Sequence, residues 1–116
     1  SLEYAKQLSE KAKEIGKEVN IHIAVDTGMG RIGFLPNKKS VEQVVEINEL
    51  SNIKIAGTFT HFSNADEKDK DYAYMQINKF NSFKISIICI AWILPSRRSK
   101  ISELGLICSL KSDAKL

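Results

Sequence analysis

The chain has 116 residues, of which 43% are hydrophobic and 27% are charged, and its formal net charge is +3. This composition is typical of a single globular domain and argues against a disordered chain. The length excludes a closed (β/α)₈ barrel, which needs about 250 residues.

The first half of the chain predicts two helices around one strand. Apolar residues at helical spacing indicate a helix over 2–16, with Gly16 as its stop. Residues 20–25 (NIHIAV) predict a short strand, and a glycine-rich loop follows over 26–37. Ser40, with Gln43 three residues later, predicts a capping box that opens a second helix running to about Leu50.

The second half predicts two strands around a third helix. Residues 53–59 predict a strand, and a polar loop follows over 60–70. A helix is expected over 71–83, and the apolar run 85–94 predicts a buried third strand. This run is about half the length of a membrane-spanning helix, so no membrane span is expected.

The resulting order, α-β-α-β-α-β, predicts an α/β fold with parallel strands, because helical crossovers return the chain in the same direction. Ligands of such folds bind where the strands end at their carboxyl side. The loops at 26–34 and 60–67 should therefore share one edge of the sheet. This arrangement would bring Arg31 and His61 to a common site.

The loop contains Gly28-Met29-Gly30-Arg31-Ile32-Gly33, which matches the GxGxxG pattern of dinucleotide-binding folds. The pattern is incomplete, because no helix opens at the third glycine and no acidic residue ends the next strand. A turn-rich loop with positive φ angles also explains the glycines without a ligand. It does not explain a charged Arg31 at the centre of the loop.

His61 follows a predicted strand directly, at the position where ligand-binding residues lie in parallel folds. An imidazole there can donate one hydrogen bond and accept another, and so can orient a charged neighbour. A purely structural histidine is the alternative.

Metal and nucleic-acid patterns are weak. The acidic run from Asp66 to Asp71 lacks the glycine and distal glutamate of a calcium loop, and it favours a solvated helix start. Cys89 and Cys108 lack CxxC spacing, which fits a reducing cytoplasm. The basic cluster at 97–100 has no interleaved aromatic residues. We therefore expect a cytoplasmic protein with no metal ion, no signal peptide and no nucleic-acid partner.

Two stretches taken together resemble the alanine racemase family. Residues 22–34 (HIAVDTGMGRIGF) resemble its mid-barrel strand and loop, and residues 57–67 (GTFTHFSNADE) resemble its next strand end. The spacing between them fits, as do Tyr72, Gln76 and Phe80 of the following helix. The resemblance covers about residues 1–84 and implies a partial TIM-barrel slice from the family's N-terminal barrel domain.

The resemblance implies pyridoxal 5′-phosphate as cofactor, alanine as substrate and a homodimer that supplies D-alanine for bacterial cell walls. Arg31 would hold the substrate carboxylate and touch the cofactor's phenolic oxygen, and His61 would hydrogen-bond an arginine that contacts the pyridine nitrogen. The implied cofactor- and substrate-binding residues are Arg31, His61 and Met29, supported in the loop by Asp26, Thr27, Gly28 and Gly30.

Several positions depart from the family pattern. Ala24 stands where the family commonly has a lysine that is carbamylated and paired with the signature arginine. The Schiff-base lysine and the catalytic tyrosine would lie outside residues 1–116. Residues 89–98 replace the expected phosphate-binding pair, and only a faint echo of a later family segment remains at 105–109, so 85–116 is interpreted as a divergent tail.

These departures predict that the chain alone is inactive, whereas its apolar run and exposed sheet edges predict self-association. The alternative is a non-catalytic remnant that binds a phosphate or carboxylate ligand, or a partner protein.

Overall fold

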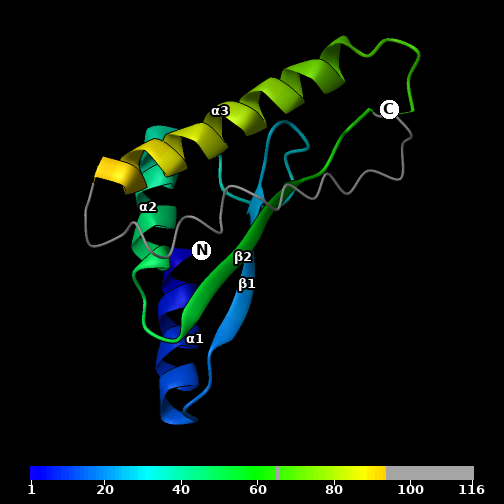
Figure 1. Ribbon diagram of the computed structural model, residues 1–116. Helices are drawn as coiled ribbons and strands as arrows, with labels where there is room; N and C mark the ends of the chain where they lie inside the picture. Colours follow the sequence, from blue (N-terminus) through cyan, green and yellow to red (C-terminus); the bar gives the residue numbers. More distant parts are fainter. Residues whose placement is uncertain (65, 94–116) are drawn as a thin grey trace.

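The computed structural model describes residues 1–64 and 66–93. Its elements in chain order are α1 (Leu2–Glu14), β1 (Val19–Val25), α2 (Lys38–Asn48), β2 (Ile53–Thr60) and α3 (Asp71–Ile93) (Figure 1).

The two strands of the described chain form a parallel pair, as the sequence predicts. The register runs from Val19 opposite Ile53 to Val25 opposite Thr60, with an irregularity between Ile21 and His22. The crossover through α2 forces the parallel direction, because the chain must return to the same end of the sheet. Both strands therefore end side by side, and the loops after Val25 and Thr60 leave from one edge.

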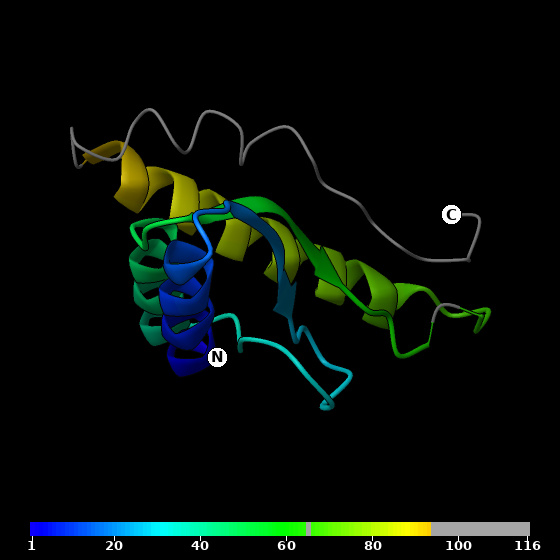
Figure 2. The same cartoon turned by 90° about the horizontal axis from the view of Figure 1, so that it is seen from below.

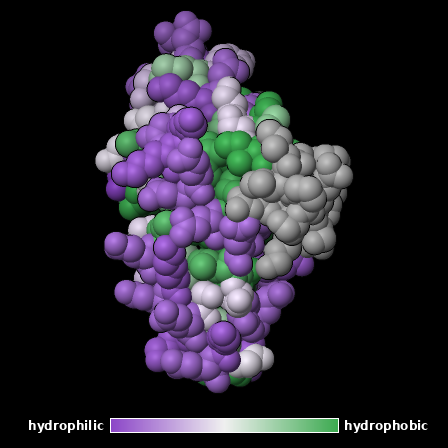
Figure 3. All heavy atoms as spheres, turned by 90° about the vertical axis from the view of Figure 1, so that its left-hand side faces the viewer, coloured by the Kyte–Doolittle hydropathy of each residue, from purple (hydrophilic) through white to green (hydrophobic). Residues whose placement is uncertain are grey.

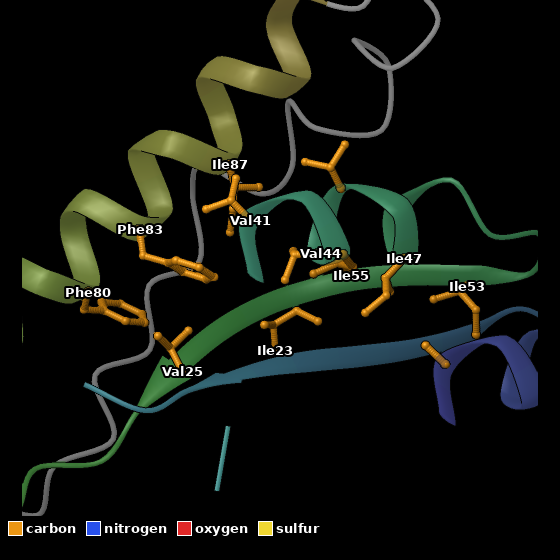
Figure 4. Packing of buried hydrophobic residues seen from close by; sticks show 12 residues of the cluster. Ile23, Val25, Val41, Val44, Ile47, Ile53, Ile55, Phe80, Phe83 and Ile87 are labelled. Carbon is orange, nitrogen blue, oxygen red and sulfur yellow. The ribbon is translucent and has the colours of Figure 1, made fainter. Parts of the chain in front are cut away.

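The core lies between one face of this sheet and the helices (Figure 4). Ile23 and Ile55 lie on that face and are 3% and 2% exposed, whereas His22, on the alternate face of β1, is exposed. The buried apolar cluster comprises Ala5, Ile23, Val25, Val41, Val44, Val45, Ile47, Ile53, Ile55, Phe80, Phe83 and Ile87. The sheet is thus covered on one face by α1, α2 and α3 within the described residues.

The first helix ends at Glu14, just before the predicted stop at Gly16. The Ser1 side chain accepts a hydrogen bond from the Tyr4 amide and caps the helix start. Gly16 has φ 65°, and the Lys17 amide donates to the Ala12 carbonyl, which closes the last turn. Glycine tolerates this left-handed conformation, so it stops the helix without strain.

The predicted start of the second helix is wrong. Asn37, not Ser40, is the N-cap of α2, because its Oδ1 accepts a hydrogen bond from the Ser40 amide at 2.9 Å. Ser40 lies inside the first turn and is buried, so the capping box that Ser40 and Gln43 predict does not form. Asparagine is among the strongest N-cap residues, and Asn37 caps the helix three residues before Ser40.

The predicted third strand over 85–94 is also wrong. Residues 85–93 continue α3, which runs without interruption from Asp71 to Ile93. No glycine or proline occurs between residues 71 and 94, so nothing in the sequence reverses the chain. Phe80, Phe83 and Ile87 continue the helical spacing into the core. Tertiary packing therefore overrides the β preference of the isoleucines, and the described residues hold two strands, not three.

The third helix begins near the carboxyl edge of the sheet and then runs past α2 (Figures 1 and 2). On the face shown in Figure 3, hydrophobic side chains interrupt a largely hydrophilic surface.

Within residues 1–64 and 66–93, none of the helices has the length and hydropathy that a membrane span requires. The basic cluster at 97–100, Cys108 and the segment 105–109 lie outside the described residues.

Candidate functional site

The loop after β1 closes back on the strand that precedes it. The Asp26 amide donates to the Phe34 carbonyl at 2.9 Å, and the Phe34 amide donates to the Ala24 carbonyl at 2.8 Å. Gly33, at φ 119°, makes this closure possible, because a Cβ there would lie 2.8 Å from the Asp26 amide nitrogen. The loop 26–34 is therefore a closed turn with Arg31 near its tip.

The carboxylate of Asp26 organises the interior of the loop. Its Oδ1 accepts hydrogen bonds from the amides of Gly28 and Gly30, at 3.1 and 3.0 Å. The Tyr72 hydroxyl of α3 donates to the Gly28 carbonyl at 3.0 Å, and a Cβ at Gly28 would collide with that hydroxyl. Glycine at this position thus allows α3 to approach the loop closely. The glycines serve a turn, which agrees with the ligand-free interpretation of the GxGxxG pattern.

A chain of buried hydrogen bonds joins the two strand ends. The Thr60 hydroxyl donates to the Val25 carbonyl at 2.8 Å, and the Thr27 and Thr60 hydroxyl oxygens are 2.7 Å apart. Each hydroxyl has one proton, so Thr27 must donate to Thr60 in the second bond. Thr27 and Thr60 are 1% and 2% exposed. The two strand ends are therefore locked by bonds of fixed direction.

Gln76 of α3 extends this chain to the loop after β2. Its Nε2 donates to the Thr27 hydroxyl at 3.1 Å and to the His61 carbonyl at 3.2 Å. Its Oε1 accepts from the Ser63 amide at 3.1 Å. The side chain is fully buried. We call the set Val25, Thr27, Thr60, His61, Ser63 and Gln76 the strand-end network.

The structure brings the two segments together, as the order of elements predicts. Arg31 and His61 both follow the carboxyl edge, on the loops that the strand-end network joins. Both side chains are exposed, and Met29 is 38% exposed. Across residues 1–64 and 66–93, the Arg31 guanidinium makes no hydrogen bond or ion pair. The edge therefore presents a cation and an imidazole to solvent.

Two hollows lie elsewhere on the molecule. A groove of about 920 Å³ runs between the start of α2 and α3, and its walls include Val41, Met75 and Phe83. A hollow of about 470 Å³ lies between α1 and β1, next to Leu8 and Phe34. Neither is lined by Arg31 or His61. Among the described residues, no group of three His, Cys, Asp or Glu side chains could hold a metal ion.

The sequence identifies the loop 26–34 but does not show which residues hold it in place. Thr60 and Ser63 were not singled out as site residues, and Gln76 entered only through the family resemblance. The usable signal is the position of Gln76, four residues before Phe80 and seven before Phe83, which places it on the apolar face of the helix. An amide on that face must find partners for its hydrogen-bonding groups. The partners themselves are set by tertiary structure.

The comparisons with known proteins agree on one family. The family model for the alanine racemase N-terminal domain matches residues 1–88. An alanine racemase of Clostridium novyi is 60% identical over 83 residues, which are 72% of this chain and 21% of that protein. An alanine racemase structure of Clostridium difficile matches with a TM-score of 0.74 and 42% identity, covering 75% of this chain and 23% of that one.

A histidine racemase of Leuconostoc mesenteroides also matches, with a TM-score of 0.64 and 28% identity over 70% of this chain and 22% of that one. The chain spans about a fifth of the length of the curated relatives it matches. The expected fold class, parallel β/α units that form part of a barrel, is confirmed by these structures. The chain belongs to the alanine racemase family, and its residues 1–88 correspond to part of that family's N-terminal domain.

Proposed function

We propose that this chain carries part of the amino-acid-binding site of a pyridoxal-phosphate-dependent alanine racemase, which interconverts L- and D-alanine. The observation that carries the proposal is the pairing of the Arg31 loop with the His61 strand end at one edge of a parallel sheet. Ligands of parallel α/β folds bind at this edge. Alanine is the proposed substrate because the relatives at 50–60% identity are alanine racemases.

Arg31 is proposed to bind the substrate carboxylate. A guanidinium offers two parallel N–H donors to a carboxylate, and such charge-assisted bonds are stronger than neutral ones. Arg31 is exposed and carries no ion pair within the described residues, so its donors face solvent. Ala24 supplies no anionic partner from β1, whereas the resemblance implies a carbamylated lysine, which is anionic, at this position in the family. Arg31 is thus available to an anionic ligand.

The donor groups at this edge also fit the anionic oxygens of pyridoxal phosphate. That cofactor, when bound, supplies the electron sink that stabilises negative charge at the substrate Cα. His61 would orient a cationic neighbour, since an imidazole can accept a hydrogen bond from a guanidinium. Met29 would line the loop beside Arg31, and Asp26, Thr27, Gly28 and Gly30 would hold the loop in shape. The proposed residues therefore bind and orient, and none of them removes the Cα proton.

The 116 residues by themselves are proposed not to racemise alanine. The lysine and tyrosine that act as bases in the family fall outside the stretch that matches it. The test is to incubate the purified chain with pyridoxal phosphate and D-alanine, and to assay L-alanine while recording the visible spectrum. No turnover above a control with free cofactor is expected. Turnover above that control would overturn the proposal and would require a substitute base, for example Lys54 or Lys84.

Substrate binding has its own test. Titration of the chain with L-alanine should shift the NMR signal of the Arg31 side chain, and Arg31→Met should abolish the change at the neighbouring loop amides. The matched control is Lys38→Met, which removes an exposed cation outside the loop 26–34. Equal responses in the wild-type chain and Arg31→Met would contradict the proposed role of Arg31.

A second candidate function is a non-catalytic module that binds a carboxylate or phosphate through Arg31, or binds a partner protein. The exposed, unpaired guanidinium within the described chain favours this candidate as much as it favours the first. Titration separates the two: the first candidate predicts a larger NMR response to L-alanine than to acetate or inorganic phosphate at equal concentration, whereas the second predicts similar responses to any of these anions.

Three further proposals concern the parent activity, the assembly of the chain and its C-terminal segment. We propose that the parent activity supplies D-alanine for cell-wall synthesis in the cytoplasm. We propose that the chain self-associates, since both strands have a free edge within the described residues and Ile85 is 58% exposed. We also propose that residues 85–116 are a divergent tail; the family match ends at residue 88 and so supports this proposal from residue 89 onward. Size-exclusion chromatography tests self-association, and a stable monomer at high concentration would contradict it.

A further inference from the structure

We propose that Gln76 is a positioning residue that fixes the Arg31 loop relative to the His61 strand end. The inference rests on the proposed function, since it assigns a purpose to the geometry of that site. Gln76 itself is fully buried, so it acts through the backbone and side chains that it binds.

The orientation of the Gln76 amide is dictated by its backbone partners. The His61 carbonyl can only accept a hydrogen bond and the Ser63 amide can only donate one. A flipped amide would place oxygen against oxygen at His61 and nitrogen against N–H at Ser63. Both donors of Nε2 are therefore used, one toward His61 and one toward Thr27. This arrangement needs a glutamine, because a carboxylate has no donor and an asparagine is one methylene shorter.

Gln76 connects two segments that are far apart in the sequence. Its bond to Thr27 holds the second residue of the Arg31 loop, and its bonds to His61 and Ser63 hold the first residues after β2. Tyr72, one turn earlier in α3, binds the same loop through the Gly28 carbonyl. The helix therefore holds the loop 26–34 at two residues, Thr27 and Gly28. Gln76 also joins Thr27 to the segment that follows β2.

The network is cooperative because its donor-to-acceptor directions all run the same way along the chain of groups. Protons point from Gln76 to Thr27, from Thr27 to Thr60 and from Thr60 to the Val25 carbonyl. Hydrogen bonds in such chains polarise one another and stiffen the groups that they join. Removing the Gln76 amide would leave the Thr27 hydroxyl without its donor and the Ser63 amide without its acceptor. We expect the Arg31 loop then to sample other positions.

The experiment compares amide hydrogen exchange by NMR in the wild-type chain and in Gln76→Met. Methionine keeps the length of the side chain but removes both donors and the acceptor. We expect exchange at the Ser63 amide to rise by about tenfold, because this amide loses its part-buried acceptor, with a smaller rise at Gly30. The Ile55 amide in the strand pair should be unchanged. A rise at Ile55 as large as that at Ser63 would indicate general destabilisation and would overturn the inference.

Two matched variants test the coupling. Thr27→Val removes the hydroxyl at nearly constant shape, and Thr27→Ser keeps it. Thr27→Val should reproduce the loop effect of Gln76→Met, the double variant should show little more than either single change, and Thr27→Ser should restore wild-type exchange. Asn81→Met, an exposed amide on the same helix, is the control and should change nothing. Fully additive effects would overturn the inference.

Alanine titration of the same variants separates this inference from the proposed function. The apparent affinity for alanine falls in proportion to the fraction of chains that keep the ordered loop. We expect a loss of up to about tenfold. A wild-type chain that does not respond to alanine, in the presence of the expected exchange changes, would overturn the proposed function and leave the positional coupling standing. Normal exchange at Ser63 in Gln76→Met would overturn the positioning role, whatever the alanine titration shows.

Discussion

The strand-end network and the second half of α3 are held in place by different forces. In the network, buried hydroxyl, amide and carbonyl groups meet at 2.7 to 3.2 Å, and each bond has one possible direction. In the second half of α3, Phe83 and Ile87 pack into an apolar cluster without directional contacts. The first region depends on which atoms a side chain carries, whereas the second depends on how much apolar surface it buries.

This difference decides which substitutions each region tolerates. A change of shape at constant polarity should damage the second half of α3, where packing density sets the energy. A change of polarity at constant shape should damage the network, because a buried polar group that loses its partner keeps its desolvation cost. The following substitutions test that contrast, in order of decreasing expected effect.

The largest effect is expected for Ile87→Ala compared with Ile85→Ala. Ile87 is 2% exposed and Ile85 is 58% exposed, since residues two positions apart lie on nearly opposite faces of a helix. Ile87→Ala should lower the free energy of unfolding by about 2–5 kcal/mol because it leaves a cavity in the core. Ile85→Ala should change it by less than about 0.5 kcal/mol. Urea denaturation of both variants measures the difference.

The pair also tests the helix itself. In a strand, residues 85 and 87 would lie on the same face, and both substitutions would cost similar amounts. Equal losses would therefore contradict the continuation of α3 through residue 93. A selective loss at Ile87 would agree with it.

The same region shows where the sequence pattern is insufficient. The run ISIICIAWIL (residues 85–94) is rich in β-branched residues, so it predicts a strand, but a short apolar run fits a buried helix equally well. The positions of Phe80 and Phe83 decide between the two structures. Ile87 follows them at helical spacing, and all three side chains pack into the core with α2 and the sheet. That information lies in tertiary packing and not in the run itself.

The strand-end region was more predictable, for a physical reason. The parallel direction of β1 and β2 follows from the crossover helix, so the loops with Arg31 and His61 had to leave from the same edge. Glycines in the loop 26–34 indicated a turn, which Gly28 and Gly33 make. The pairing of Thr27 with Thr60, 33 residues apart, could not be predicted, because it depends on the register of the two strands.

Thr60→Val tests the network at constant shape. Valine removes the proton that Thr60 donates to the Val25 carbonyl and the oxygen that accepts from Thr27. We expect a loss of about 1–3 kcal/mol in the free energy of unfolding, because two buried groups are left without that partner. Urea denaturation measures the loss, and Thr60→Ser serves as the control that keeps the hydroxyl. A loss for Thr60→Ser greater than that for Thr60→Val would show that packing of the methyl group, not the hydrogen bonds, matters at this site.

The smallest effect is expected at the cap of α2, where a directional bond lies at the surface. Asn37 is exposed, and its Oδ1 accepts the Ser40 amide at 2.9 Å. Asn37→Ala should cost about 1 kcal/mol, as for other N-cap residues, and less than Thr60→Val because water can replace the lost acceptor. Asn37→Asp should retain the cap. Ser40→Ala should cost less than about 0.5 kcal/mol, because Ser40 lies inside α2 and alanine has the higher helix propensity. If Ser40→Ala instead costs more than Asn37→Ala in urea denaturation, the helix begins at Ser40, as the capping box predicts. If the order is as expected, a hydrogen bond of similar length contributes less at the exposed start of α2 than between the buried strand ends, and solvent access accounts for the difference.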